Sequence, residues 1–304
     1  MRCKKFLIFT IGLALFQSAG SAETAPPLDT AVIEQVTGLK GAFNKEENVF
    51  KVSKPRTDVK IEVDGWAMPP FMGLTSWAAF TPAHDGQTMM MGDTVVFEDE
   101  VNAAMSAALD AGLEVTALHN HFFFDAPKVY FMHIGGTGKL EALASGVKQV
   151  FDTVAGIRAA LPEPKKVFGG QKIGAGNAIS SGPVESALGV KGEAKDGMFK
   201  VVIGRPATMH GTPVAKEMGV NTWAAFAGTD EGAIIDGDFA MTEKELQTVL
   251  RAMRKENINI VAIHHHMANE EPRILFLHYW AKGPAASLAQ SLRTVLDAQS
   301  LITK

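Results

Sequence analysis

One stretch of this chain occurs twice, and the repetition limits the folds that the chain can adopt. The sequence reads VTALHNH at residues 115–121 and IVAIHHH at residues 260–266, which is 145 positions later. Each copy is followed by a proline-containing turn and by a second apolar run that ends in another histidine, His133 or His278. The same offset continues without a gap from residue 92 through the last helical segment of each copy. The chain therefore contains an internal duplication, a feature that decides the fold class before any local pattern does.

The first 22 residues have the pattern of an export signal. Basic residues precede an apolar run at residues 6–16, and small residues follow it, which predicts cleavage near Ala22. Cys3 is the only cysteine and leaves with this segment, so we expect neither a disulfide nor a thiol ligand. No later apolar run reaches the length of a bilayer span. We expect a periplasmic or secreted protein that does not insert into a membrane after the signal is removed.

The remaining residues are too many for one ordinary domain, and their composition marks a boundary. Residues 159–177 are rich in proline, glycine and lysine, which is typical of a linker. The duplication places the first repeat domain at residues 28–158 and the second at residues 178–299. We expect the two repeats to pair within the molecule as a pseudo-dimer.

Each repeat reads as strands, a helix, two strands and a final helix. An apolar stripe at helical spacing covers residues 98–111, and Thr242 with Glu245 forms a capping box for the equivalent helix. Adjacent strands joined by short turns predict an antiparallel or mixed sheet with helices packed on it, which is the α+β class. Residues 58–68 predict a hairpin that turns at Asp64–Gly65, and the second copy shows no clear equivalent of it.

The charge of the chain argues against several classes of partner. The formal net charge is −4, and removing the signal segment takes away three basic groups and no acidic one. A net acidic chain without a basic run is a poor candidate for binding nucleic acid or anionic lipid. Neither a glycine-rich phosphate loop nor a serine or cysteine nucleophile motif is present. The sequence leaves the identity of any small ligand open.

Histidines are the one concentrated set of chemically active side chains. Six of the nine histidines fall into two triplets, which are His119, His121 and His133 in the first copy and His264, His266 and His278 in the second. Strand residues two apart point to one face, so each His-x-His pair shares a face. The third histidine joins it if, for example, His119 lies opposite His133 across the hairpin. Three neutral imidazoles suit zinc, and they also suit copper or nickel.

Acidic residues at matching positions supply candidates for a fourth ligand or a catalytic base. Asp93 and Asp238 follow matching glycines, and Glu100 and Glu245 hold matching helical positions. Arg56 and Arg205 also match, and they can serve an anion or an ordinary salt bridge. The hypothesis is an exported protein that binds divalent metal through both triplets, either for metal binding itself or for hydrolysis by metal-bound water.

A non-enzymatic reading competes with this hypothesis. Histidines in strands often make hydrogen bonds within a core, and a duplication copies core residues as well as functional ones. In that reading the protein is an envelope binding or scaffold protein without a cofactor. Its binding site is then a groove between the halves near Trp77 and Trp223.

The chain resembles the LppY/LpqO family of exported bacterial proteins. The residues that carry the resemblance include GLTSWAAF at 73–80, ALHNH at 117–121 and FMH at 131–133, and the second copy repeats most of them. The resemblance covers nearly all of the chain after the signal segment. It implies export and a doubled domain, and the family brings no assigned activity.

Overall fold

A computed structural model describes residues 28–302 of the chain, and the expected signal segment lies outside these described residues. The first repeat contains three helices, which are α1 (Thr30–Thr37), α2 (Val101–Asp110) and α3 (Leu140–Ala160). Its strands are β1 (Gly41–Asn44), β2 (Val49–Pro55), β3 (Glu62–Val63), β4 (Trp66–Ala67), β5 (Thr75–Pro82), β6 (Thr88–Phe97), β7 (Glu114–His119), β8 (Asp125–Ala126) and β9 (Val129–Gly138). Short 3-10 turns cover Pro70–Met72 and His84–Gly86.

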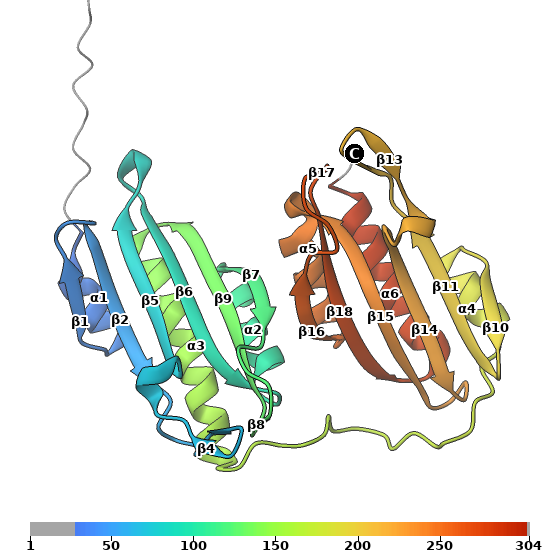
Figure 1. Ribbon diagram of the computed structural model, residues 1–304, viewed down its shortest axis with the longest axis horizontal. Coiled ribbons are helices and arrows are strands. Elements are labelled where there is room, and N and C mark those ends of the chain that lie inside the picture. The colour runs from blue at the N-terminus through green and yellow to red at the C-terminus, as the bar shows by residue number, and fades with distance from the viewer. Residues whose placement is uncertain (1–27, 303–304) are drawn as a thin grey trace, which may run out of the picture.

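The second repeat follows the same order. Its helices are α4 (Ser181–Leu188), α5 (Glu243–Lys255) and α6 (Ala285–Ser300), and a 3-10 turn covers Lys216–Met218. Its strands are β10 (Gly192–Lys195), β11 (Met198–Gly204), β12 (Ala207–Met209), β13 (Thr212–Val214), β14 (Asn221–Gly228), β15 (Ala233–Thr242), β16 (Asn259–His264), β17 (Glu270–Glu271) and β18 (Ile274–Gly283). Residues 161–180 connect α3 to α4 as the long strap at the bottom of Figure 1.

The two repeats build one antiparallel sheet of twelve strands. Its order is β1-β2-β5-β6-β9-β7 in the first half and β16-β18-β15-β14-β11-β10 in the second. The helices of each repeat lie behind the strands in the view of Figure 1. The duplicated α+β architecture predicted from the sequence is therefore confirmed, and the sheet is antiparallel throughout.

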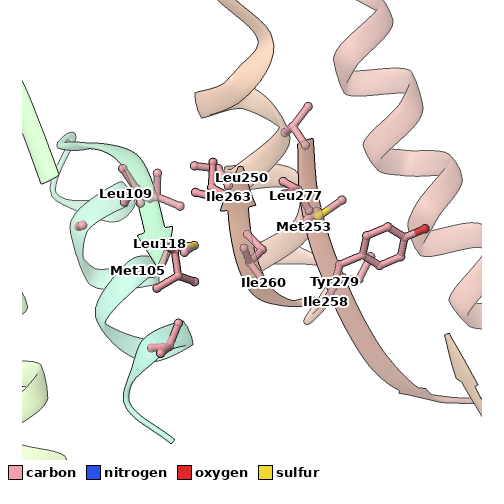
Figure 2. Packing of buried hydrophobic residues seen from close by; sticks show 14 of the residues in the cluster. Met105, Leu109, Leu118, Leu250, Met253, Ile258, Ile260, Ile263, Leu277 and Tyr279 are labelled. Atoms are coloured by element: carbon pink, nitrogen blue, oxygen red, sulfur yellow. The ribbon is translucent and has the colours of Figure 1, made fainter. Parts of the chain in front are cut away.

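The seam between the repeats lies where β7 pairs with β16. Leu118 pairs with Ile263, its own counterpart in the other repeat, so the two halves are related about this point. Both side chains enter a hydrophobic cluster that continues from α2 to α5 (Figure 2). One apolar core therefore serves both repeats.

Two side-chain amides fasten the seam symmetrically. Asn102 on α2 accepts from the backbone N–H of Ile260 at 2.8 Å and donates to its carbonyl at 3.3 Å. Gln247 on α5 does the same for Val115, with distances of 3.0 Å and 2.9 Å. Both backbone positions flank a register shift in the pairing with β9 or β18, where regular ladder bonds are interrupted. Each repeat thus satisfies backbone groups of the other.

Local sequence cues mark several helix ends, whereas α2 begins at Val101, three residues after the start of the predicted range 98–111. Gly38 ends α1 in a left-handed conformation, and the predicted capping box of Thr242 and Glu245 begins α5. Among residues 28–302, no helix is long and apolar enough to cross a membrane.

A small three-stranded sheet covers part of the remaining face in each repeat. In the first repeat it is β4-β3-β8, which contains the predicted hairpin with Asp64 and Gly65 both at positive φ. The second repeat has the equivalent sheet β13-β12-β17, so the expectation that it lacks this hairpin was wrong. Its turn uses His210 and Gly211, also at positive φ. The turn was not predicted because His-Gly is a far weaker hairpin signal than Asp-Gly.

Candidate metal centres

The strand register brings the first histidine triplet together with Asp93. Asp93 on β6 pairs with His133 on β9, which in turn pairs with Ala117 on β7. His119 is two residues beyond Ala117 and therefore lies on the same face, diagonal to His133. The direct pairing of His119 with His133 considered from the sequence does not occur, because His119 pairs with Phe131. The shared face follows from parity in either register.

The second repeat reproduces this arrangement residue by residue. Asp238 on β15 pairs with His278 on β18, which pairs with Ala262 on β16, and His264 pairs with Phe276. The neighbouring residues Leu118 and Ile263 are buried in the core on the helix side. The histidines therefore project from the sheet face that the helices do not cover.

Three side chains of the second repeat converge closely enough to hold one metal ion. His266 Nε2 lies 3.0 Å from Asp238 Oδ2 and 3.1 Å from His264 Nε2. One ligand atom from each of these three residues lies within 4.8 Å of the other two. The third histidine is close, since the rings of His264 and His278 are 4.5 Å apart between centroids. This group could hold a metal ion.

The first repeat has the same residues with a different closest pair. His119 Nε2 lies 3.1 Å from His133 Nε2, and the rings of His119 and His121 are 5.2 Å apart between centroids. Asp93 is buried beside them and lies near enough for all three histidines to influence its charge.

An aromatic side chain forms one wall of each centre. His121 stacks on Phe131 at 3.3 Å between ring centroids, and His266 stacks on Phe276 at 3.5 Å. Neither phenylalanine was predicted from the sequence to take part in the site. The available signal was their position two residues before the third histidine, which puts them on the same strand face.

The electrostatics of the two aspartates are unusual for carboxylates. Burial raises the pKa of Asp93 and of Asp238, and positive charge on the surrounding histidines opposes this rise. The Oδ1 atom of each has no hydrogen-bond partner among the described residues. A buried carboxylate oxygen without a partner carries a desolvation cost that a bound cation could offset.

Two of the imidazoles, those of His264 and His121, have a lowered pKa, which favours the neutral form that ligates metals. Burial, followed by the positive charges of His278 and His266, lowers the pKa of His264 to about 4. Burial is also the main cause that lowers the pKa of His121. Neutral histidine has the free nitrogen lone pair that a metal requires.

Two of the four acidic candidates do not belong to the centres. Glu100 receives two hydrogen bonds from Arg56, at 2.7 Å and 3.0 Å, and one from the backbone of Phe97. Glu245 is bound in the same way by Arg205, at 2.8 Å and 3.0 Å. These glutamates tie the starts of α2 and α5 to the residues that directly follow β2 and β11. Their proposed catalytic role is therefore not supported, and the arginines serve salt bridges.

The groove imagined near Trp77 and Trp223 is also not formed. These residues lie on β5 and β14, which are seven strand positions apart in the sheet and so on the order of 30 Å from each other. Each ring instead packs under its own lysine, Lys51 or Lys200, at 4.2 Å and 4.4 Å.

A cavity of about 340 Å³ lies away from the histidines. It is formed by the start of α2, the strap and β16, and its lining includes Tyr130, Lys165, Phe168 and Asn259. It contains no residue of either candidate centre, so it does not serve as a substrate pocket over them.

Comparison with known proteins identifies the family of the chain. No curated protein matches it. Two solved structures show weak similarity, and both are trimeric microcompartment shell proteins. PduB is 11% identical, with 86% of this chain and 92% of that chain covered and a TM-score of 0.21. The double-ringed shell protein of the RMM microcompartment is 10% identical, with 73% and 85% covered and a TM-score of 0.17.

A family model matches the chain twice, at residues 31–153 and 182–298, and leaves out the strap between the repeats. These matches lie inside the two repeats and together cover most of the chain. The chain belongs to the family described as a domain of unknown function, DUF1259.

Proposed function

We propose that each repeat binds one divalent metal ion on the open face of the sheet. The ligands of the two centres are Asp93, His119, His121 and His133 in the first repeat, and Asp238, His264, His266 and His278 in the second. The observation that carries the proposal is the convergence of Asp238, His264 and His266, whose ligand atoms lie within 4.8 Å of one another.

The spacing of these atoms suits a tetrahedral ion. Zinc bonds to nitrogen and oxygen are about 2.0–2.2 Å long, so two ligands at a tetrahedral angle are roughly 3.3 Å apart. The separations of 3.0 Å and 3.1 Å around His266 are close to this value. A set of three imidazoles and one carboxylate favours zinc, copper or nickel over calcium and magnesium, which prefer oxygen ligands.

Solvent access supports a chemical role in addition to binding. The side chains of His266 and His278 are 34% and 45% exposed, whereas Asp238 beneath them is 3% exposed. A substrate or water therefore approaches from the histidine side. A divalent ion here supplies a Lewis acid and an activated water, which makes hydrolysis the reaction class that we propose. In this proposal the aspartate anchors the ion, and the exposed imidazoles form its accessible side.

Metal analysis of the purified mature protein tests the binding proposal directly. We expect about two zinc ions per chain, and one after the change His264→Ala with His266→Ala or the change His119→Ala with His121→Ala. His84 and His210 are exposed and outside both triplets, so replacing them with alanine is the matched control and keeps both ions. A wild-type chain that takes up no zinc, copper or nickel and gains no thermal stability from them rules the proposal out.

The scaffold alternative predicts a different outcome for the same variants. If the histidines only hold the hairpins together, the double variants lose folding while metal has no effect on any of the proteins. Far-ultraviolet circular dichroism with and without zinc separates the two cases.

Export and membership of the LppY/LpqO family are part of the same proposal. The basic and apolar start of the chain supports export, and the repeated motifs at 73–80, 117–121 and 131–133 support the family resemblance. Amino-terminal sequencing of protein from the cell envelope should begin just after Ala22. A chain recovered from the cytoplasm with Met1 in place contradicts export.

A further inference from the structure

The loop that follows His121 carries aromatic side chains into solvent. Phe123 and Phe124 are 78% and 81% exposed and belong to none of the buried hydrophobic clusters among the described residues. Phe122, the residue between them and His121, packs edge-on against the His121 ring at 5.8 Å between centroids. The exposed pair is thus continuous along the chain with a residue of the first metal centre.

Two further aromatic residues extend this surface from the adjoining segment. Trp66 on β4 is 55% exposed, and Phe71 in the following turn is 98% exposed. The loop is joined to the hairpin by a hydrogen bond from the backbone N–H of Asp64 to the carbonyl of Phe124, 3.2 Å long. β3 also pairs with β8, directly after Phe124. We call Trp66, Phe71, Phe123 and Phe124 the aromatic rim.

The second repeat is an internal control, because it has the same fold without the rim. The positions of Trp66 and Phe71 are held there by Thr212 and Glu217. The positions of Phe123 and Phe124 are held by Ala268 and Asn269. The three-stranded sheet forms in both repeats. The aromatic residues are therefore not required for this fold, and their exposure in the first repeat costs solvation without a structural return.

Phe124 carries a second cost in its backbone. Its φ is 58°, in the left-handed region, and Asn269 at the equivalent position has a φ of 64°. Asparagine adopts this conformation readily, whereas a bulky residue there is an outlier. Strained and exposed residues of this kind persist chiefly at binding and catalytic sites.

We propose that the first centre takes an amphiphilic small molecule, with its anionic head on the metal and its apolar part on the aromatic rim. The inference rests on the proposed function, since the bound cation and the histidine face supply the charge complementarity for the head. Phe123 and Phe124 together expose on the order of 300 Å² of aromatic surface, and they lie two and three residues along the chain from His121. The second centre has no aromatic residue at the rim positions, so it binds the anionic head with an affinity that does not depend on the length of the apolar part.

A series of linear carboxylates tests the proposal on the zinc-loaded full chain. Acetate, butanoate, hexanoate and octanoate share one head group, so only the length of the apolar part changes. Calorimetric titration should show affinity for one of two sites rising by about two- to fourfold per methylene, the value for partial to full burial of that group. Octanoate that binds no tighter than acetate at both sites overturns the inference.

The decisive variant gives the first repeat the residues of the second. Phe123→Ala with Phe124→Asn should abolish the chain-length dependence, leave zinc content unchanged and keep or raise the melting temperature. Met218→Ala removes an exposed apolar side chain from the second repeat and should change nothing. Retained chain-length dependence in the double variant overturns the inference, and so does a large loss of stability, since it makes the aromatics structural.

The zinc content, measured before each titration, distinguishes failure of the amphiphile proposal from failure of the metal-binding proposal. A chain without bound zinc overturns the proposed function, and this inference falls with it. A chain with two zinc ions and no chain-length dependence leaves the metal centres in place and refutes the amphiphile alone.

Discussion

At the scale of single residues, a buried carboxylate beside neutral imidazoles costs folding free energy unless a cation balances it. Asp238 is in this position, with its pKa raised by burial. Its folded pKa lies above its unfolded pKa, so the stability of the metal-free protein falls as pH rises between these two pKa values, and the full cost applies above the folded pKa. Natural proteins keep such costs where function requires them.

We therefore expect Asp238→Asn to stabilise the metal-free protein. The substitution removes the buried charge and keeps the shape of the side chain. In the presence of a chelator at pH 7, the melting temperature should rise by a few degrees, the effect of about 1 kcal/mol in a protein of this size. Zinc should no longer raise it through the second centre. A marked fall in the metal-free melting temperature contradicts an anchoring role for the aspartate.

The lowered pKa of His264 predicts an acid-sensitive apoprotein. Its folded pKa is about 4, because burial and the charges of His278 and His266 disfavour its protonation. An unfolded histidine titrates near 6.5, so between these values the unfolded state binds more protons and stability is lost as pH falls. Thermal melts of chelated His264→Gln between pH 7 and pH 4.5 should show a shallower decline than the wild type. If the melting temperatures of the variant and the wild type fall in parallel, His264 does not cause the acid sensitivity.

Sequence reasoning succeeds for the ligands that lie close together in the chain and fails for interactions between distant residues. Parity alone puts His119 and His121 on one face, and the repeat offset selects Asp93 and Asp238. From the sequence, Glu100 was as good a candidate for the site as Asp93, because no local pattern shows that Arg56 is buried against it. The exposed state of Phe124 is likewise invisible, since an apolar triplet after a strand reads as core.

At the scale of elements, the buried ion pairs fix where α2 and α5 begin. Arg56 is buried, and besides Glu100 it contacts Asp58 and the carbonyl of Val95. Arg158 from α3 also reaches Glu100, at 2.7 Å. Glu100 is therefore shared by two guanidinium groups at the junction of β6, α2 and α3, and each group also pairs with an aspartate, Asp58 or Asp99. Removing one partner of such a network leaves buried charge uncompensated.

Glu100→Gln should destabilise the protein without emptying the metal centres. We expect a loss of about 3–5 kcal/mol in the free energy of unfolding, as for other broken buried pairs. Urea denaturation gives this value, and metal analysis under native conditions should still find two ions. Lys148→Ala, which breaks an exposed pair with Asp152 on α3, is the matched control and should cost less than about 1 kcal/mol. If the glutamine variant loses one ion, Glu100 contributes to metal binding after all.

At the scale of the whole molecule, the duplication is readable from the sequence and the way the halves join is not. A constant offset shows that two equal units exist. The seam depends on a single strand pairing at Leu118 and Ile263, together with contacts between α2 and α5, and strand edges carry no sequence mark that chooses one partner. The result is that both candidate centres face the same side of one sheet, near its middle.

The amide fasteners across the seam give the last prediction. Asn102 and Gln247 each satisfy a backbone N–H and carbonyl of the opposite repeat. Arg251 and Arg254 on α5 donate further hydrogen bonds across the seam, to the carbonyl of Leu109 and the hydroxyl of Ser106. Asn102→Ala with Gln247→Ala leaves four backbone groups without their side-chain partners. The cost is about 1–3 kcal/mol for each group that stays buried and unpaired.

The wild type should unfold in one calorimetric transition, because one core runs through both repeats. The double variant should melt at a lower temperature and in two resolved transitions, whereas Lys244→Ala, an exposed change on α5, should behave like the wild type. Zinc should then raise each transition separately, because each repeat holds a complete set of ligands. A single unchanged transition in the double variant would mean that the apolar contacts around Leu118 and Ile263, together with the arginine hydrogen bonds, hold the halves together without the amides.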